Sequence, residues 1–146
     1  MRTAQYVMTF VCLLALSSCS VFKKSKGEVK DGNVITDRKW KLVELAGKPV
    51  SGLVNGKEPY ILLQQKDGRY LATGGCNGIG GTYELKANGR IKFDQGMSTM
   101  MACENMEVER ELSKALISAD NYSLSGDDLS INKARMAPLA RFEAVK

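Results

Sequence analysis

The chain contains no histidine. This absence excludes Ser-His-Asp and Cys-His nucleophile systems, HExxH metal sites and histidine general bases. A glycosidase-like hydrolase that works with two carboxylates needs no histidine, but no pair of acidic residues stands out in the sequence. We therefore expect a protein that is not an enzyme.

Aromatic residues are also scarce, at 7% of the chain. The formal net charge is +5, yet the positive residues are scattered. They are not combined with the aromatic residues or the sequence modules that are typical of a nucleic-acid-binding surface. We expect no nucleic-acid partner.

The main apolar stretch is too short to cross a membrane. It runs from Tyr6 to Leu16, whereas a membrane-spanning helix needs roughly 20 residues. It follows Arg2 and leads into "LSSC", Leu16 to Cys19, which resembles the bacterial lipobox. This order predicts a lipoprotein signal peptide over residues 1–18 and acylation of Cys19. The alternative is an ordinary signal peptide with a coincidental cysteine.

Residues 19–37 are lysine-rich and polar, which predicts a lipidated N-terminus followed by a flexible tether. Residues 38–146 then form a single domain. Ser20 follows the acylated cysteine; because aspartate at that position favours retention in the inner membrane, we expect an outer-membrane anchor with the domain facing the periplasm. The expected partners are the membrane, through the lipid at Cys19, and an unknown protein or small molecule. We expect a monomer.

Short alternating segments separated by turn residues predict an α+β fold that is mostly antiparallel β. We expect about seven to eight strands in a small twisted sheet or open barrel. Asp67-Gly68 and Asn88-Gly89 are hairpin signals. Residues from Asn105 to Ala119 have helical periodicity, with Asn105 as N-cap, and predict one helix that covers an opening of the barrel. The expected core consists of Trp40, Leu42, Ile61, Leu63, Tyr83, Phe93, Leu112, Leu116, Leu124, Ile131 and Phe142.

The glycine-rich stretch "GGCNGIGG", Gly74 to Gly81, begins like a phosphate-binding loop. Gly81 stands where such a loop has its lysine, and the residues that follow alternate like a strand rather than opening a helix. The pattern instead indicates a connection between two strands, with glycines at positions of positive φ or close backbone approach. We expect no cofactor.

Methionines surround Cys103: Met97, Met100, Met101 and Met106 lie within a few positions of it. Soft sulfur ligands select Cu(I), so copper binding is one interpretation. The other is that the methionines fill irregular core gaps where the helix meets the sheet. We favour the second and expect no metal.

Four cysteines are present. Cys12 leaves with the signal peptide and Cys19 is acylated, so Cys76 and Cys103 remain as a pair in an oxidising compartment. A disulfide between them is expected. Two buried, reduced thiols are the alternative.

Several motifs, in order, resemble the META/HslJ family of bacterial envelope proteins. They are Trp40-x-Leu42, Gly75-Cys76-Asn77 with Gly81 and Tyr83, Thr99-Met100-Met101-Ala102-Cys103, and Tyr122-x-Leu124-x-Gly126 leading to Leu129-x-Ile131. The specific portion is the Gly-Cys-Asn and Thr-x-Met-Ala-Cys pair, so Gly75, Asn77, Thr99, Met100 and Met101 form our candidate binding surface. Met100 departs from the family, where a basic residue is usual.

The resemblance implies a non-catalytic binding or structural role in the envelope, because relatives are associated with heat shock and novobiocin tolerance. Two alternatives stay open. A carrier of small hydrophobic ligands would need an apolar cavity inside the barrel. An inhibitor of an envelope hydrolase would present an exposed loop, for which Gly74 to Gly81 is the candidate.

Overall fold

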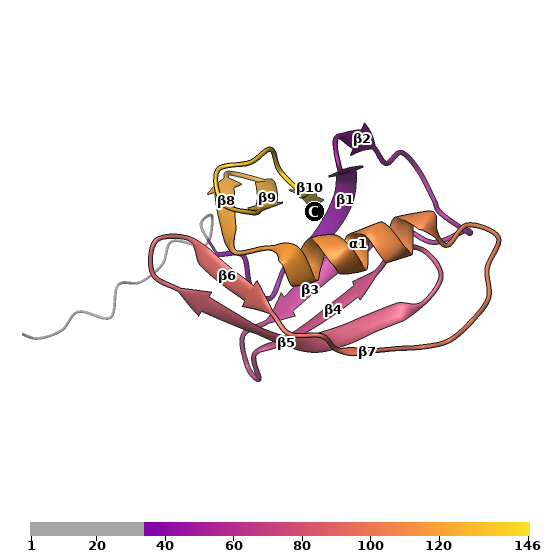
Figure 1. The fold of residues 1–146 in the computed structure, drawn as a ribbon, viewed down its shortest axis with the longest axis horizontal. Coiled ribbons are helices and arrows are strands. Elements are labelled where there is room, and N and C mark those ends of the chain that lie inside the picture. Colours follow the sequence, from indigo (N-terminus) through magenta and orange to yellow (C-terminus); the bar gives the residue numbers. More distant parts are fainter. Residues whose placement is uncertain (1–33) are drawn as a thin grey trace, which may run out of the picture.

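Tight turns and alternating side chains build a closed antiparallel barrel in the computed structural model, which describes residues 34–146 (Figure 1). Its strands are β1 (Lys39–Leu45), β3 (Tyr60–Gln64), β4 (Arg69–Thr73), β5 (Gly78–Lys86), β6 (Arg90–Phe93), β8 (Asn121–Ser125), β9 (Asp128–Asn132) and β10 (Ala140–Ala144). Two short strands, β2 (Lys48–Pro49) and β7 (Met97–Ser98), and one helix, α1 (Glu107–Ser118), complete the fold. The predicted fold class is therefore confirmed.

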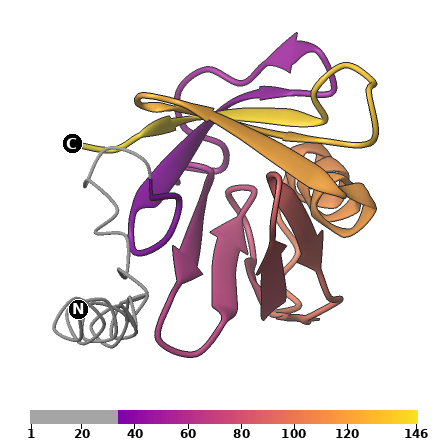
Figure 2. The ribbon, with the colours of Figure 1, turned by 90° about the vertical axis from the view of Figure 1, so that its left-hand side faces the viewer.

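Neighbouring strands follow the order β10-β9-β8-β6-β5-β4-β3-β1, and β1 also pairs with β10, which closes the barrel of eight strands. Figure 2 shows β3 to β6 side by side, with β8 to β10 crossing at the top of the view. Asn88 and Gly89 both have positive φ, 61° and 67°, as the predicted hairpin turn between β5 and β6 requires. Register places Trp40 opposite Ala144 where the first and last strands meet.

The barrel is uneven around its circumference. β6 and β8 are joined through a single residue pair, Arg90 with Asn121, whereas β3 and β4 share five. The helix α1 lies across the strands (Figure 1) and contacts β6 beside this weak seam. Leu112 and Leu116 of α1 are fully buried in the core. The helix therefore supplies apolar packing where the sheet has few hydrogen bonds.

Large side chains fill the interior. The predicted core is confirmed except at Leu124, which is only partly buried. Tyr70 and Ile91 are buried core residues that the prediction omitted. Within the described residues, no buried side-chain nitrogen or oxygen lacks a hydrogen-bond partner.

Packing begins before the predicted domain boundary. Ile35 is buried, its carbonyl oxygen accepts a hydrogen bond of 2.9 Å from Trp40 Nε1, and the Asp37 amide donates to the Leu63 carbonyl. The predicted signal peptide, the Cys19 lipidation site and most of the predicted tether lie outside the described residues. No helix in residues 34–146 combines the length and apolarity needed to cross a membrane.

The start of the helix differs from the prediction. The N-cap is Met106, without a side-chain cap, and not Asn105. Asn105 instead exchanges hydrogen bonds with Asn55 through its backbone, and its side-chain oxygen accepts from the Glu107 amide at 3.1 Å. These contacts hold Asn105 in the preceding loop, so the helix begins at Glu107.

Candidate functional site

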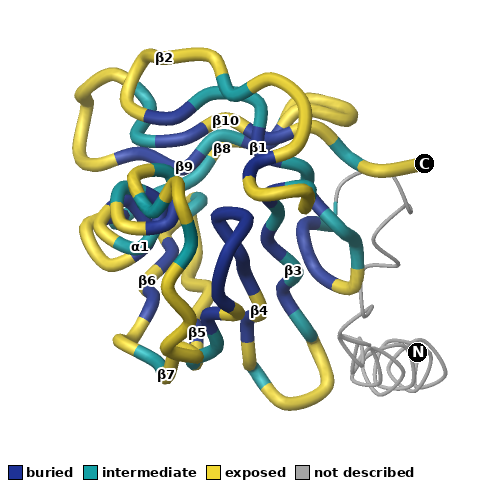
Figure 3. Tube along the Cα trace, turned by 90° about the vertical axis from the view of Figure 1, so that its right-hand side faces the viewer, coloured by how far each residue is buried: buried dark blue, intermediate teal, exposed yellow. Residues whose placement is uncertain are grey.

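The two motifs of the candidate surface meet at one end of the barrel. The loop between β4 and β5, residues 74–77, lies against the segment 99–106 that leads into α1, and against the first turn of α1. We call this arrangement the loop junction. Figure 3 shows the loop between β4 and β5 as a buried turn near α1.

Asn77 is the centre of the loop junction and is 2% exposed. Its side-chain oxygen accepts hydrogen bonds from the Thr99 hydroxyl at 2.8 Å and the Met101 amide at 2.7 Å. Its side-chain nitrogen donates to the Met101 carbonyl at 3.1 Å and to Glu109 Oε1 at 2.8 Å. One amide side chain thus binds two separate segments, the loop before α1 and α1 itself, because asparagine combines two donors with an acceptor.

Glu109 is the buried partner of Asn77 in the junction that the sequence analysis missed. It is 6% exposed, and its carboxylate accepts from both the backbone and the side-chain nitrogen of Asn77. The available signal was its spacing, since Glu109 precedes Leu112 and Leu116 by one and two turns on the buried face.

The glycines of this loop allow close approach, as expected for a connection between strands. A Cβ on Gly74 would overlap the backbone and side chain of Glu109. Gly75 has a φ of 111°, and a Cβ there would meet Val54. The amides of Gly75 and Asn77 already donate to Thr73 Oγ1 and to Glu109, so these donors are occupied within the protein.

A disulfide between Cys76 and Cys103 links the two segments covalently, with a Cα separation of 6.0 Å. Cys76 is buried and Cys103 is half-buried. Because the sulfurs are bonded to each other, Cys103 offers no thiolate to a Cu(I) site. Among residues 34–146, no three His, Cys, Asp or Glu side chains are grouped so that they could hold a metal ion.

The candidate binding surface divides into two parts. Gly75 and Asn77 are interior residues, whereas Thr99 is exposed, Met101 is 49% exposed and Met100 is 99% exposed. The interpretation that methionines fill core gaps is wrong for Met100, because Asn77 binds the neighbouring backbone and the side chain projects into solvent. The same holds for Met97, which is 81% exposed. Gly75 and Asn77 position the loop, and of the five candidate residues only Thr99, Met100 and Met101 are accessible to a binding partner.

A groove of about 420 Å³ lies beside the junction, between β7 and α1. Tyr70 and Ile79 form its buried apolar floor, and Ser98 of β7 lines one side. Lys114 and Ile117 of α1, both exposed, line the other. Gln95, Gly96, Ser113 and Ser118 complete the lining. The groove is therefore bounded by a strand and a helix and has an apolar floor.

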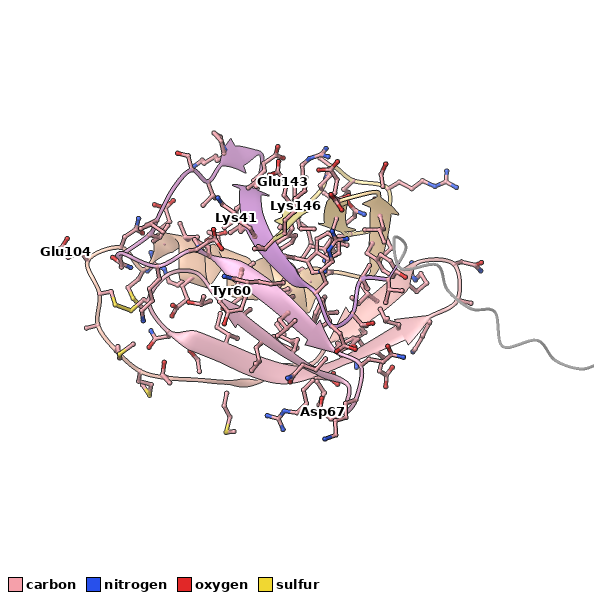
Figure 4. All side chains as sticks on the ribbon, turned by 180° about the vertical axis from the view of Figure 1, so that it is seen from behind. Lys41, Tyr60, Asp67, Glu104, Glu143 and Lys146 are labelled. Atoms are coloured by element: carbon pink, nitrogen blue, oxygen red, sulfur yellow. A yellow bond between two sulfur atoms is a disulfide. The ribbon has the colours of Figure 1, made fainter. Side chains whose placement is uncertain are left out.

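The outer face of β3, β1 and β10 carries paired charges. Figure 4 shows Tyr60, Lys41 and Glu143 near one another, and they occupy paired register positions. Lys39 lies 4.6 Å from the centre of the Tyr60 ring, and its ammonium group is 3.0 Å from Glu58. The hydrogen bond from Lys39 is the main cause that lowers the pKa of Glu58. This face has a solvated ion-pair network.

A family model described as META domain matches residues 33–146. The chain belongs to the META domain family. No curated protein matches the sequence. The family assignment agrees with the motifs that meet in the loop junction, Gly75-Cys76-Asn77 and Thr99 to Cys103.

Solved structures with the same fold have low sequence identity. A structure described as "NMR structure of the protein" is 20% identical with a TM-score of 0.58, over 75% of this chain and 90% of the other. A protein from Burkholderia xenovorans is 19% identical with a TM-score of 0.56, over 76% and 83%. A duf4847 family protein from Bacteroides vulgatus ATCC 8482 is 14% identical with a TM-score of 0.54, over 75% and 94%. These similarities concern the fold alone.

Proposed function

We propose that this META domain protein is an envelope lipoprotein whose domain acts as a non-catalytic binding module in stress or drug tolerance. The observation that carries the proposal is the disulfide between Cys76 and Cys103, since such bonds persist in oxidising compartments such as the periplasm. The lipobox-like segment that ends at Cys19 agrees with this location. Two acyl chains or more would make the anchor stable.

The filled barrel favours binding at the surface over carriage of a ligand inside. Trp40, Tyr70 and Phe142 are each no more than 1% exposed and occupy the interior that a lipid would need. The inhibitor alternative through Gly74 to Gly81 also loses support, because residues 74–77 are buried and hydrogen-bonded within the junction. The exposed segment after β7 and the groove beside it are the better candidate surfaces.

Replacement of the predicted lipidation site tests the proposal. Cys19→Ser should move the protein from the outer-membrane fraction to the soluble periplasmic fraction, and should fail to restore heat or novobiocin tolerance to a deletion strain. Cys12→Ser is the matched control and should behave as the wild type. An unchanged membrane fraction for Cys19→Ser would contradict the anchor, and full tolerance from the soluble protein would contradict a role at the membrane.

A further inference from the structure

Strand β7 has a free edge beside the groove. Within the described residues it pairs only with β5, through Ile79 with Ser98 and Gly80 with Met97. An edge strand presents backbone N–H and C=O groups that can pair with an added strand. Gly96 lets the chain approach β5 closely just before this edge, since a Cβ there would overlap the backbone of Gly80.

The side chains around this edge suit a strand with one apolar face. Ser98 and Ile79 are directly opposite in register, so their side chains point to the same side, toward the groove. Ile117, 45% exposed, lines the facing wall on α1. An apolar side chain from an added strand would cover Ile117 and Ile79 together. The groove volume of about 420 Å³ is within the usual range for a ligand site.

Lys114 is the only charged residue among those that line the groove. Its ammonium group lies 2.7 Å from Glu111 Oε1, and both side chains are exposed. This hydrogen bond is the main cause that lowers the pKa of Glu111. Lys114 is therefore the group in the groove lining that an incoming carboxylate could pair with, in competition with Glu111.

We propose that the groove binds an extended, acidic peptide segment, which adds to β7 as a strand and pairs its carboxylate with Lys114. A free strand edge needs a partner with alternating donors and acceptors, which an extended peptide supplies and a lipid chain does not. The inference deepens the proposed binding role and rests on it. It identifies the surface and the chemical class of the partner.

The test uses the purified protein, labelled with nitrogen-15, and the N-acetylated, C-amidated peptide Val-Thr-Val-Thr-Asp as the probe in an NMR titration, because its two valines and its aspartate lie on the same face of an extended strand. The amide of Ser98 and its neighbours should shift, and Lys114→Gln should weaken binding about fivefold, as for one exposed ion pair. Glu111→Gln should strengthen binding, because it releases Lys114.

Two changes in the peptide serve as controls. A peptide that ends in Asn should be insensitive to both protein substitutions. Proline at the central position of the peptide should remove binding because it lacks the backbone N–H.

Lys114→Arg is the control for a retained charge and should bind as the wild type does. Thermal unfolding of each variant checks that the fold is intact. The inference is overturned if the probe does not bind at millimolar concentration, if shifts occur away from β7 and α1, or if Lys114→Gln binds equally well. A second copy of the chain in the groove would appear instead as a dimer in light scattering. If the probe peptide does not bind but Cys19→Ser still abolishes tolerance, the groove is not a peptide-binding site and the proposed function remains.

Discussion

Asn77 and Glu109 lie 32 positions apart in the sequence and share two hydrogen bonds inside the loop junction. One residue belongs to the loop after β4 and the other to the first turn of α1. The pair therefore attaches the N-terminal end of α1 to the barrel, while the C-terminal end of the helix leads into β8. Asn77 also binds the backbone of Met101 through both its side-chain nitrogen and its side-chain oxygen, so the exposed segment after β7 depends on this buried residue.

Replacement of Asn77 by Ala should lower the free energy of unfolding by about 2–4 kcal/mol, because a buried carboxylate and the Met101 backbone would lose their partners. Urea unfolding followed by the fluorescence of the single tryptophan, Trp40, measures this change. Thr99→Val removes the hydroxyl that donates to Asn77 and accepts from the Gly78 amide, but leaves the bonds of Asn77 to Met101 and Glu109, so it should cost less, about 1 kcal/mol. Equal costs for the two variants would show that the Asn77 network contributes little.

Gly74→Ala should destabilise the protein strongly, since the new Cβ would overlap the helix backbone at Glu109. We expect a loss of about 2 kcal/mol or more, as for other overpacked sites. Gly78→Ala is the matched control, because a Cβ there has no other atom within 4 Å. Thermal or urea unfolding of the two variants makes the comparison, and similar midpoints would mean that the loop is not held against α1.

Removal of the disulfide should destabilise the domain without changing its fold. The cysteines are 27 positions apart, and loss of a cross-link over such a loop costs roughly 3 kcal/mol in the chain-entropy model. The double variant Cys76→Ser/Cys103→Ser and the reduced wild type should show the same lower urea midpoint. Two free thiols in the denatured, unreduced protein would contradict the disulfide.

Alkaline pH should destabilise the protein through two tyrosines. Burial is the main cause that raises the pKa of both Tyr70 and Tyr83 above 10.0. The neutral forms are therefore favoured in the folded state, and their contribution to stability is complete below the unfolded pKa of about 10. It is lost as pH rises from there through the folded pKa values. Urea midpoints measured across this range should fall, and should fall less steeply in Tyr70→Phe and Tyr83→Phe.

The eight long strands could be predicted because each has local alternation and most have a turn signal beside them. Asn88-Gly89 marks one such turn, and both residues adopt the positive φ that the pair favours. The strands β2 and β7 have two residues each, too few for any period to appear. Closure of the barrel was not predicted either, since the pairing of β1 with β10 leaves no local pattern in the sequence.

The site was predictable only in part, for the same reason. Cysteine number and compartment predicted the disulfide, but the burial of Asn77 depends on a carboxylate supplied by a helix far along the chain. The segment around Met100 was read as core because methionine usually packs in apolar surroundings. Its exposure follows from the backbone contacts of Met101, which hold the main chain and leave the side chains outside.

The pairing of β1 with β10 has a consequence for the order of folding. The first strand cannot obtain its last neighbour until the final strand of the chain is available, and contacts between such distant segments carry the largest loop-closure entropy. Until that moment both strands expose unpaired edges, which are sites of intermolecular association. A ribosome or translocation channel that releases the chain gradually would therefore hold an incomplete barrel, and a truncation within β10 should yield aggregation rather than a smaller stable domain.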